Sequence, residues 1–237
     1  MELKQRLQSV KERVAAAARA AGRNPDEITL CAATKVQSDD TIRAAIAAGI
    51  EVCGENRVQE LCAHLETDAY AGARQVHFIG HLQTNKVNKV VGRVELIHSV
   101  DSFRLLEAID RQAEKLGIVQ DILLQVNIGG EDSKGGVEPE GLEELARQAL
   151  QMKYVRLRGL MAIPPLALEP GGNTHYFAKM RQLFVDMQKK MAHNESDMDC
   201  LSMGMSGDYE DAIAQGATLV RVGTALFGPR PAPGNQN

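Results

Sequence analysis

The chain has 237 residues, of which 44% are hydrophobic and 24% are charged, a composition typical of a folded globular protein and not of a disordered or fibrous one. Its formal net charge of −4 argues against the basic surface that nucleic-acid binding requires. The sequence holds no apolar run of the roughly 18 residues that cross a bilayer, and its first residues lack the apolar core of a signal peptide, so we predict a cytoplasmic protein without nucleic-acid or membrane partners.

Residues 1–22 predict an amphipathic helix, because Leu3, Leu7, Val10 and Val14 fall on one stripe at helical spacing. After this helix, short apolar or β-branched runs alternate with helical stretches, which is the pattern of strands connected by helices. The runs lie at 28–34, 51–56, 75–80, 95–101, 121–129, 155–163, 200–206 and 219–228.

Eight strands separated by helices favour parallel pairing through right-handed crossovers. Several helical stretches begin on Ser or Asp and end on a glycine, as at Gly49, Gly117 and Gly216. We therefore predict an α/β fold, a (β/α)8 TIM barrel. The alternative is a doubly wound open sheet, which would leave the apolar run 219–228 as an exposed edge strand.

The last nine residues, "PRPAPGNQN", are too short and too rich in proline to form a helix after the eighth strand. We expect the N-terminal helix to cover that flank of the barrel instead. The predicted organisation is one barrel domain over residues 1–228 and a flexible tail over 229–237. Because the flank is already covered, a monomer is expected.

The four cysteines are scattered without a CxxC pair, which predicts reduced thiols and no structural metal. His77 and His81 stand four apart in "HFIGH", a spacing that suits a metal only on a helix. Their neighbours predict a strand, where such side chains are well separated, so no metal site is expected.

In a parallel barrel the chemistry lies where the strands end. Lys35 follows the first strand, in "ITLCAATK". At such a position a lysine is either a solvated cap or, if it is enclosed, an amine that loses its proton easily and becomes a nucleophile.

The seventh and eighth strand ends resemble a phosphate site. Ser206 and Gly207 in "GMSGD" leave a strand and open a helix, where backbone N–H groups face an anion. Gly223 and Thr224 in "VGTALFG" add a close backbone approach and a hydroxyl donor. A plain glycine turn with a capping serine remains the alternative.

Arg221 stands two residues before Gly223, so strand alternation places its side chain towards the barrel interior. A buried guanidinium needs a partner, either a structural carboxylate such as Glu55 or a ring nitrogen of a ligand. Together with Lys35 and the phosphate loops, this arrangement suits a phosphorylated aldehyde.

The segments "AATK", "GENRVQE", "HFIGHLQTNK", "EDSKGG", "RGLMAI", "LSMGMSGD" and "VRVGTALFG" strongly resemble the pyridoxal phosphate homeostasis proteins, single-barrel relatives of the alanine racemase N-terminal domain. The resemblance runs in order from about Val10 to Gly228. It implies a type III pyridoxal-phosphate fold without a C-terminal β-domain. It also implies the cofactor pyridoxal phosphate, bound by a Schiff base through Lys35.

The resemblance further implies the roles of the other site residues. Asn56 matches the asparagine beside the cofactor, and Arg221 matches the residue that faces the pyridine nitrogen. Because an arginine cannot act as an acid there, it would leave that nitrogen unprotonated and weaken the ring as an electron sink. Ser206, Gly207, Gly223 and Thr224 match the phosphate cradle, while Lys134 and His81 have no assigned role.

Racemisation needs a base on each face of the substrate, and Tyr209 is the only tyrosine near the phosphate loop. Its position suits packing or phosphate contact better than proton abstraction. We therefore expect a carrier or regulator in vitamin B6 and amino-acid homeostasis, with apo-enzymes as recipients of the cofactor, and no catalytic residue. The alternatives are a weak pyridoxal-phosphate-dependent amino-acid racemase and a sugar-phosphate barrel enzyme.

Overall fold

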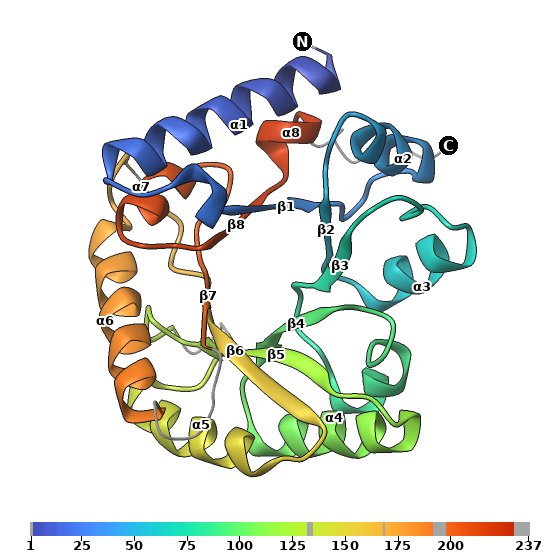
Figure 1. The fold of residues 1–237 in the computed structure, drawn as a ribbon, viewed down its shortest axis with the longest axis vertical. Helices are drawn as coiled ribbons and strands as arrows, with labels where there is room; N and C mark the ends of the chain where they lie inside the picture. Colours follow the sequence, from blue (N-terminus) through green and yellow to red (C-terminus); the bar gives the residue numbers. More distant parts are fainter. Residues whose placement is uncertain (1, 132–134, 168, 192–197, 230–237) are drawn as a thin grey trace.

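A computed structural model describes residues 2–131, 135–167, 169–191 and 198–229. Eight parallel strands form a closed barrel in chain order, and β8 pairs with β1 (Figure 1). This confirms the predicted (β/α)8 barrel over the open sheet. Each strand lies within the run predicted for it, give or take one residue at its start: β1 (Thr29–Ala33), β2 (Val52–Glu55), β3 (Gln75–Phe78), β4 (Leu96–Val100), β5 (Gln120–Val126), β6 (Val155–Ala162), β7 (Cys200–Ser202) and β8 (Leu219–Val222).

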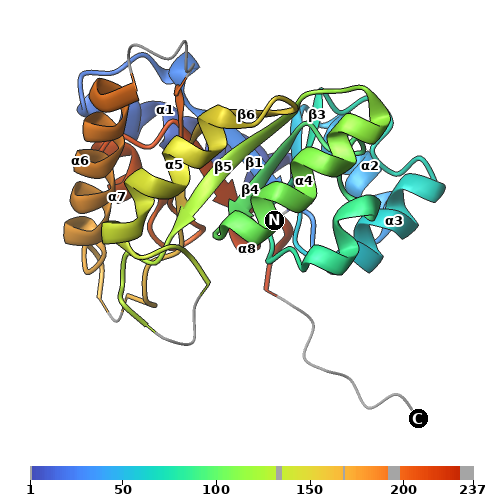
Figure 2. The same ribbon diagram turned by 90° about the horizontal axis from the view of Figure 1, so that it is seen from below.

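The helices form an outer ring around the strands (Figures 1 and 2). The connection from β3 to β4 contains a 3-10 helix, η2 (Thr84–Lys89), where Val87 is buried and Lys89 is exposed. The other helices are α1 (Leu3–Ala20), η1 (Pro25–Glu27), α2 (Asp39–Ala47), α3 (Val58–Glu66), α4 (Phe103–Leu116), η3 (Pro139–Gly141), α5 (Leu142–Gln151), α6 (Thr174–Met191), α7 (Tyr209–Ala214) and α8 (Thr224–Phe227).

Helix α4 illustrates how the sequence pattern produces the outer ring. Leu105, Leu106, Ile109 and Ala113 recur at helical spacing and are buried against the barrel. The helix ends at Gly117, whose φ of 66° lies in the left-handed region that favours glycine. The predicted helix end is thus confirmed at this position.

Helix α1 covers the side of the barrel where the last strand, β8, meets the first strand, β1, as predicted. It buries Leu7, Val10 and Val14, and it lies beside α7 and α8 (Figure 1). Arg6 Nε donates a hydrogen bond to the Leu226 carbonyl at 2.6 Å.

The predicted extent of the eighth strand, residues 219–228, was wrong. The strand ends at Val222, and residues predicted as its continuation form α8. The backbone turns at Gly223 because Phe227 N donates to the Gly223 carbonyl at 2.9 Å, which closes one helical turn. The predicted tail begins at Pro229, and residues 230–237 lie outside the described part of the chain.

Ion pairs cross the lower end of the barrel, where the strands begin. Arg158 donates to Asp121 at 2.8 Å and to Asp199 at 2.5 Å, and Arg156 donates to Asp121 at 2.6 Å. Among the described residues, no helix combines the length and apolar character needed to span a membrane.

Candidate functional site

The chain reverses direction immediately after β1, where Lys35 stands. Thr34 is fully buried and donates from both N and Oγ1 to the Gly54 carbonyl, at 2.9 and 3.1 Å. Val36 adopts a φ of 59°, unusual for a β-branched residue, and its N–H donates to Glu60 Oε2 at 2.7 Å. Lys35, between these two anchors, is half-buried. A fully solvated cap is therefore excluded, and the lysine stands at a fixed turn on the mouth of the barrel.

The end of β2 presents Asn56 to the same mouth. Glu55 is fully buried, and its Oε1 accepts the N–H groups of Asn56 at 2.7 Å and Arg57 at 3.3 Å. Burial raises the pKa of the Glu55 carboxyl. Asn56 Oδ1 is buried and makes no hydrogen bond within the described residues. An orphaned acceptor of this kind suits a ligand that donates a hydrogen bond.

A polar cluster supports both of these loops from outside the barrel. His64 Nδ1 lies 2.6 Å from Asp39 Oδ1, and its Nε2 lies 3.9 Å from Glu55 Oε2. Glu55, Glu60 and His64 bring ligand atoms within 4.8 Å of one another, an arrangement that could hold a cation and that the sequence did not predict. Both carboxylates already accept backbone N–H groups next to Lys35 or at Asn56, so in this structure the cluster holds the two loops.

The predicted phosphate residues come together at the ends of β7 and β8. Ser206 Oγ accepts hydrogen bonds from Gly223 N at 3.0 Å and Ala225 N at 3.3 Å. In both of these hydrogen bonds the oxygen is the acceptor, so the hydroxyl hydrogen can donate to an anion. Gly207 and Thr224 are exposed beside it. A Cβ atom on Gly223 would lie 3.5 Å from the Cβ of Ala33, so this cradle adjoins the end of β1.

Asp208 holds the loop that is predicted to bind phosphate, and the sequence reasoning missed it. Its Oδ1 accepts from Met205 N at 2.7 Å, and its Oδ2 accepts from Asn173 Nδ2 at 2.8 Å. Gly204 has a φ of 89°, and a Cβ there would lie 2.6 Å from the Cβ of Ala212. The signal was available, because an Asp directly before a helix is a preferred N-terminal residue.

Arg221 lies inside the barrel, as strand alternation predicts, and is only 4% exposed. Its Nη2 donates to the Ala162 carbonyl at 2.9 Å and its Nη1 donates to Ser202 Oγ. The suggested pairing with Glu55 was wrong, because inward-facing Gly54 places its neighbour Glu55 on the outer face of β2, towards His64 and Tyr70.

Arg221 has no carboxylate within ion-pair distance among the described residues. Burial lowers the pKa of its guanidinium to about 10, so it still carries its charge at neutral pH. A buried cation without an anionic partner suits a negatively charged ligand above it.

Tyr209 packs against the N-terminal helix instead of facing the mouth. Its side chain is 1% exposed, and the Arg13 guanidinium lies 5.3 Å from its ring centroid. This contact confirms the predicted packing role. Of the two residues without an assigned role, His81 is exposed and Lys134 lies outside the described residues.

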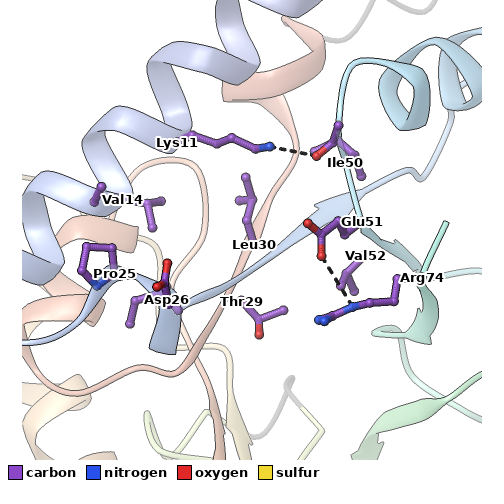
Figure 3. Close-up of a pocket in the computed structure, with 13 residues that line it drawn as sticks. Lys11, Val14, Pro25, Asp26, Thr29, Leu30, Ile50, Glu51, Val52 and Arg74 are labelled. Carbon is purple, nitrogen blue, oxygen red and sulfur yellow. Dashed lines mark hydrogen bonds and ion pairs between the residues drawn. The ribbon is translucent and has the colours of Figure 1, made fainter.

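A separate cavity of about 380 Å³ lies at the opposite end of the barrel (Figure 3). It opens between α1 and the beginnings of β1 and β2, where Lys11 Nζ donates to the Gly49 carbonyl at 2.9 Å. Arg74 and Glu51 face each other across its rim at 3.5 Å. None of the predicted site residues lines this cavity, so the candidate site remains the mouth.

Comparison with known proteins identifies the family. The chain matches the alanine racemase N-terminal domain model over residues 6–231. It is 45% identical over 226 residues to the pyridoxal phosphate homeostasis protein of Aquifex aeolicus, which covers 95% of this chain and 97% of that relative. The solved structure of PipY from Synechococcus elongatus with PLP bound is 37% identical, with a TM-score of 0.81 over 96% of this chain and 100% of that one.

A more distant structure shows the fold alone. The alanine racemase of Clostridium difficile is 15% identical, with a TM-score of 0.72, and the match covers 98% of this chain but 57% of the racemase. The family model and the close relatives together confirm the resemblance inferred from the motifs. The chain therefore belongs to the family of pyridoxal phosphate homeostasis proteins, which is built on the alanine racemase N-terminal domain.

Proposed function

We propose that the chain binds pyridoxal phosphate at the mouth of the barrel and serves vitamin B6 homeostasis as a carrier. The observation that carries this proposal is Arg221, a buried cation without an ion-pair partner among the described residues. It is supported by the orphaned acceptor of Asn56 and by the hydroxyl of Ser206. In this proposal the phosphate of the cofactor pairs with Ser206, its polar ring with Arg221 and Asn56, and its aldehyde with Lys35.

Each mouth residue has a distinct role in the proposal. Bound pyridoxal phosphate supplies an electrophilic aldehyde carbon and an electron-withdrawing ring. Lys35 provides the amine for covalent attachment, and its turn is fixed by Thr34 and by the Val36 amide. Arg221 donates towards the ring nitrogen and cannot surrender a proton, so the ring remains a weak electron sink.

The phosphate is held on the other side of the mouth. Ser206 contributes its hydroxyl hydrogen, while its oxygen fixes the Gly223 amide at the start of α8. Gly207 and Thr224 are exposed next to this hydroxyl and provide further backbone and side-chain donors. These donors meet the charge of the phosphate, while Arg221 faces the ring.

A carrier fits these groups better than a racemase. Tyr209, the tyrosine nearest the phosphate loop, is buried beneath Arg13 and does not reach the mouth. Curated relatives at 38–45% identity bear the name of homeostasis proteins. A racemase or another enzyme of weak or narrow activity remains the second candidate, supported by the shared barrel.

The first experiment is titration of the purified chain with pyridoxal phosphate, followed in the visible range. We expect a yellow complex whose band disappears in Lys35→Ala and persists in the control Lys86→Ala. Borohydride reduction and peptide mapping should place the label on Lys35. A label on another lysine, or no complex, contradicts the proposal.

A second experiment separates carrier from enzyme. The loaded protein is mixed with an apo-enzyme, and the recovery of activity is compared with cofactor release into buffer. We expect the apo-enzyme to regain activity. Recovery faster than cofactor release into buffer indicates direct transfer, and recovery at the rate of release indicates transfer through solution. Rapid Lys35-dependent exchange of Cα protons over an amino-acid panel would instead support the racemase.

A further inference from the structure

A series of hydrogen-bonded polar side chains runs from Arg221 through the barrel interior. Arg221 on β8 donates to Ser202 on β7. Ser202 Oγ lies 3.0 Å from His98 Nδ1 on β4, and His98 Nε2 lies 3.0 Å from His77 Nδ1 on β3. His77 Nε2 lies 3.1 Å from Gln75 Oε1 at the lower end of the barrel. Ser202 and His98 are fully buried and His77 is 2% exposed, so water does not replace the contacts among these three, whereas Gln75 is half-buried beside a cavity.

The chemistry of Arg221 decides which atom donates in each hydrogen bond of this series. A guanidinium only donates, so Ser202 Oγ must accept from Arg221. The Ser202 hydroxyl hydrogen has His98 Nδ1 as its acceptor among the described contacts. His98 then carries its proton on Nε2 and donates to His77 Nδ1, and His77 donates from Nε2 to Gln75 Oε1. The opposite direction would leave the Ser202 hydrogen without a partner in a dry interior, at a cost.

Both imidazoles must be neutral for this direction to hold, and their surroundings favour it. Burial lowers the pKa of His77 to about 4, with a further contribution from Arg74 that Asp121 opposes. Burial also lowers the pKa of His98, aided by His77 and Arg221. A proton on either ring would add a second buried cation near Arg221.

We propose that Ser202, His98 and His77 are positioning residues that fix the Arg221 guanidinium towards the mouth through a one-way chain of hydrogen bonds, with both histidines as neutral Nε2–H tautomers. The chain ends on the neutral Gln75, so it orients Arg221 without neutralising its charge. The charge thereby stays available to an anionic ligand. The part of this proposal that concerns the cofactor rests on the proposed function, whereas the tautomers and the orientation of Arg221 do not.

The first test is made without cofactor. Long-range ¹⁵N–¹H correlation on the full chain reports the protonated nitrogen of each imidazole, and His77→Gln and His98→Gln assign the signals. We expect Nε2–H for both rings between pH 8 and pH 6. We also expect a slowly exchanging Arg221 guanidinium signal, assigned with Arg221→Lys, that is lost in Ser202→Ala. Nδ1–H tautomers, or an unchanged guanidinium signal in Ser202→Ala, would overturn the proposal.

The second test uses pyridoxal phosphate as the probe. Ser202→Ala removes one charge-assisted contact to Arg221 and should raise the dissociation constant about tenfold, with a shifted visible band. The matched control is Ser99→Ala, because Ser99 is equally buried next to His98 but its Oγ has no hydrogen-bond partner in the described structure. Equal affinities and spectra for the two variants contradict the positioning role. If neither variant nor the parent protein binds pyridoxal phosphate, the proposed function fails. The tautomer test, which needs no cofactor, still shows whether the hydrogen bonds run in the proposed direction.

Discussion

The two ends of the barrel are both polar, but their polar groups are used differently. At the lower end Asp121, Arg156, Arg158 and Asp199 satisfy one another in ion pairs. At the mouth, Asn56 Oδ1 makes no hydrogen bond in the described structure. Ser206 Oγ only accepts in its two hydrogen bonds, and Arg221 has no carboxylate within ion-pair distance among the described residues. An unsatisfied buried group costs stability unless a ligand pairs with it, which fits the proposed binding site at the mouth. At the lower end the ion pairs stabilise the fold.

The barrel wall at Gly159 and the loop at Gly207 also differ in packing. A Cβ atom on Gly159 of β6 would lie 1.8 Å from the Cys200 carbonyl oxygen, and Gly159 has a φ of 150°. A Cβ on Gly207 at the mouth would meet nothing within 4 Å. The strands β6 and β7 are therefore close-packed at Gly159, whereas the loop predicted to bind phosphate leaves space at Gly207.

The largest expected effect is that of Gly159→Ala. The added methyl group must push β7 away from β6, so we expect a loss of about 4 kcal/mol or more in the free energy of unfolding. Urea denaturation of the purified variant measures it. Gly207→Ala is the matched control and should change stability by less than about 0.5 kcal/mol. Similar losses in the two variants would contradict the contrast in packing.

The next effect is a loss of stability in acid. Because the pKa of His77 falls from 6.5 to about 4 on folding, the unfolded chain binds a proton first as the pH drops. Stability is full above pH 6.5 and declines towards pH 4, by about 3 kcal/mol from this residue. Arg74 strengthens the trend and Asp121 weakens it.

Denaturation midpoints between pH 8 and pH 4 would measure this decline. His77→Gln should flatten the slope between pH 6.5 and pH 4, because glutamine does not titrate. As a control, the exposed Asn88→Gln, which removes no titratable group, should leave the slope unchanged. A slope that His77→Gln does not alter would show that His77 is not buried in its neutral form.

Arg158→Met should have a smaller effect, at the lower end of the barrel. It removes two ion pairs from partly buried Asp121 and from Asp199, so we expect a loss of about 1 to 3 kcal/mol. Arg147→Met, which removes exposed pairs on α5, should cost less than about 0.5 kcal/mol. Pyridoxal phosphate affinity should stay unchanged in both variants, as titration can check. A weakened affinity in Arg158→Met would couple the two ends.

Asn56→Ala should have the smallest effect on stability and a clear effect on binding. Its Oδ1 makes no hydrogen bond in the described structure, so the free energy of unfolding should change by less than about 0.5 kcal/mol. The affinity for pyridoxal phosphate should fall about tenfold, because one contact to the ligand is lost. Thermal melting with and without the ligand measures both. An unchanged ligand-induced shift in melting temperature would remove Asn56 from the site.

The strand positions could be predicted because each strand is a buried apolar run bounded by polar loops. Some ends were placed too late because Asn56 and the residues after Val222 continue the run without pairing with a neighbouring strand. Helix α8 was missed for a related reason. The turn at Gly223 depends on Ser206, which lies 17 residues earlier and on another loop.

The candidate site could be located from the sequence where a residue of suitable chemistry directly follows a strand. Lys35, Ser206 and Gly223 could be found from their place after strands, and Arg221 from its alternation with Gly223. The hydrogen bonds that continue from Arg221 through the barrel could not be found in this way, because two of the residues that they join, Ser202 and His98, are 104 positions apart. Inward alternation could have nominated His77, His98 and Ser202, but only the closed barrel brings them into contact.

The contact between Arg6 and Leu226 joins residues 220 positions apart. A ribosome needs on the order of tens of seconds to synthesise such a length, and during that time β1 has no β8 to pair with. The amphipathic first helix and the first strand must therefore wait with their apolar faces exposed, which invites chaperone binding. The mouth assembles only at closure, so the vitamin-derived ligand can assist refolding of a finished polypeptide but not the folding of a nascent one.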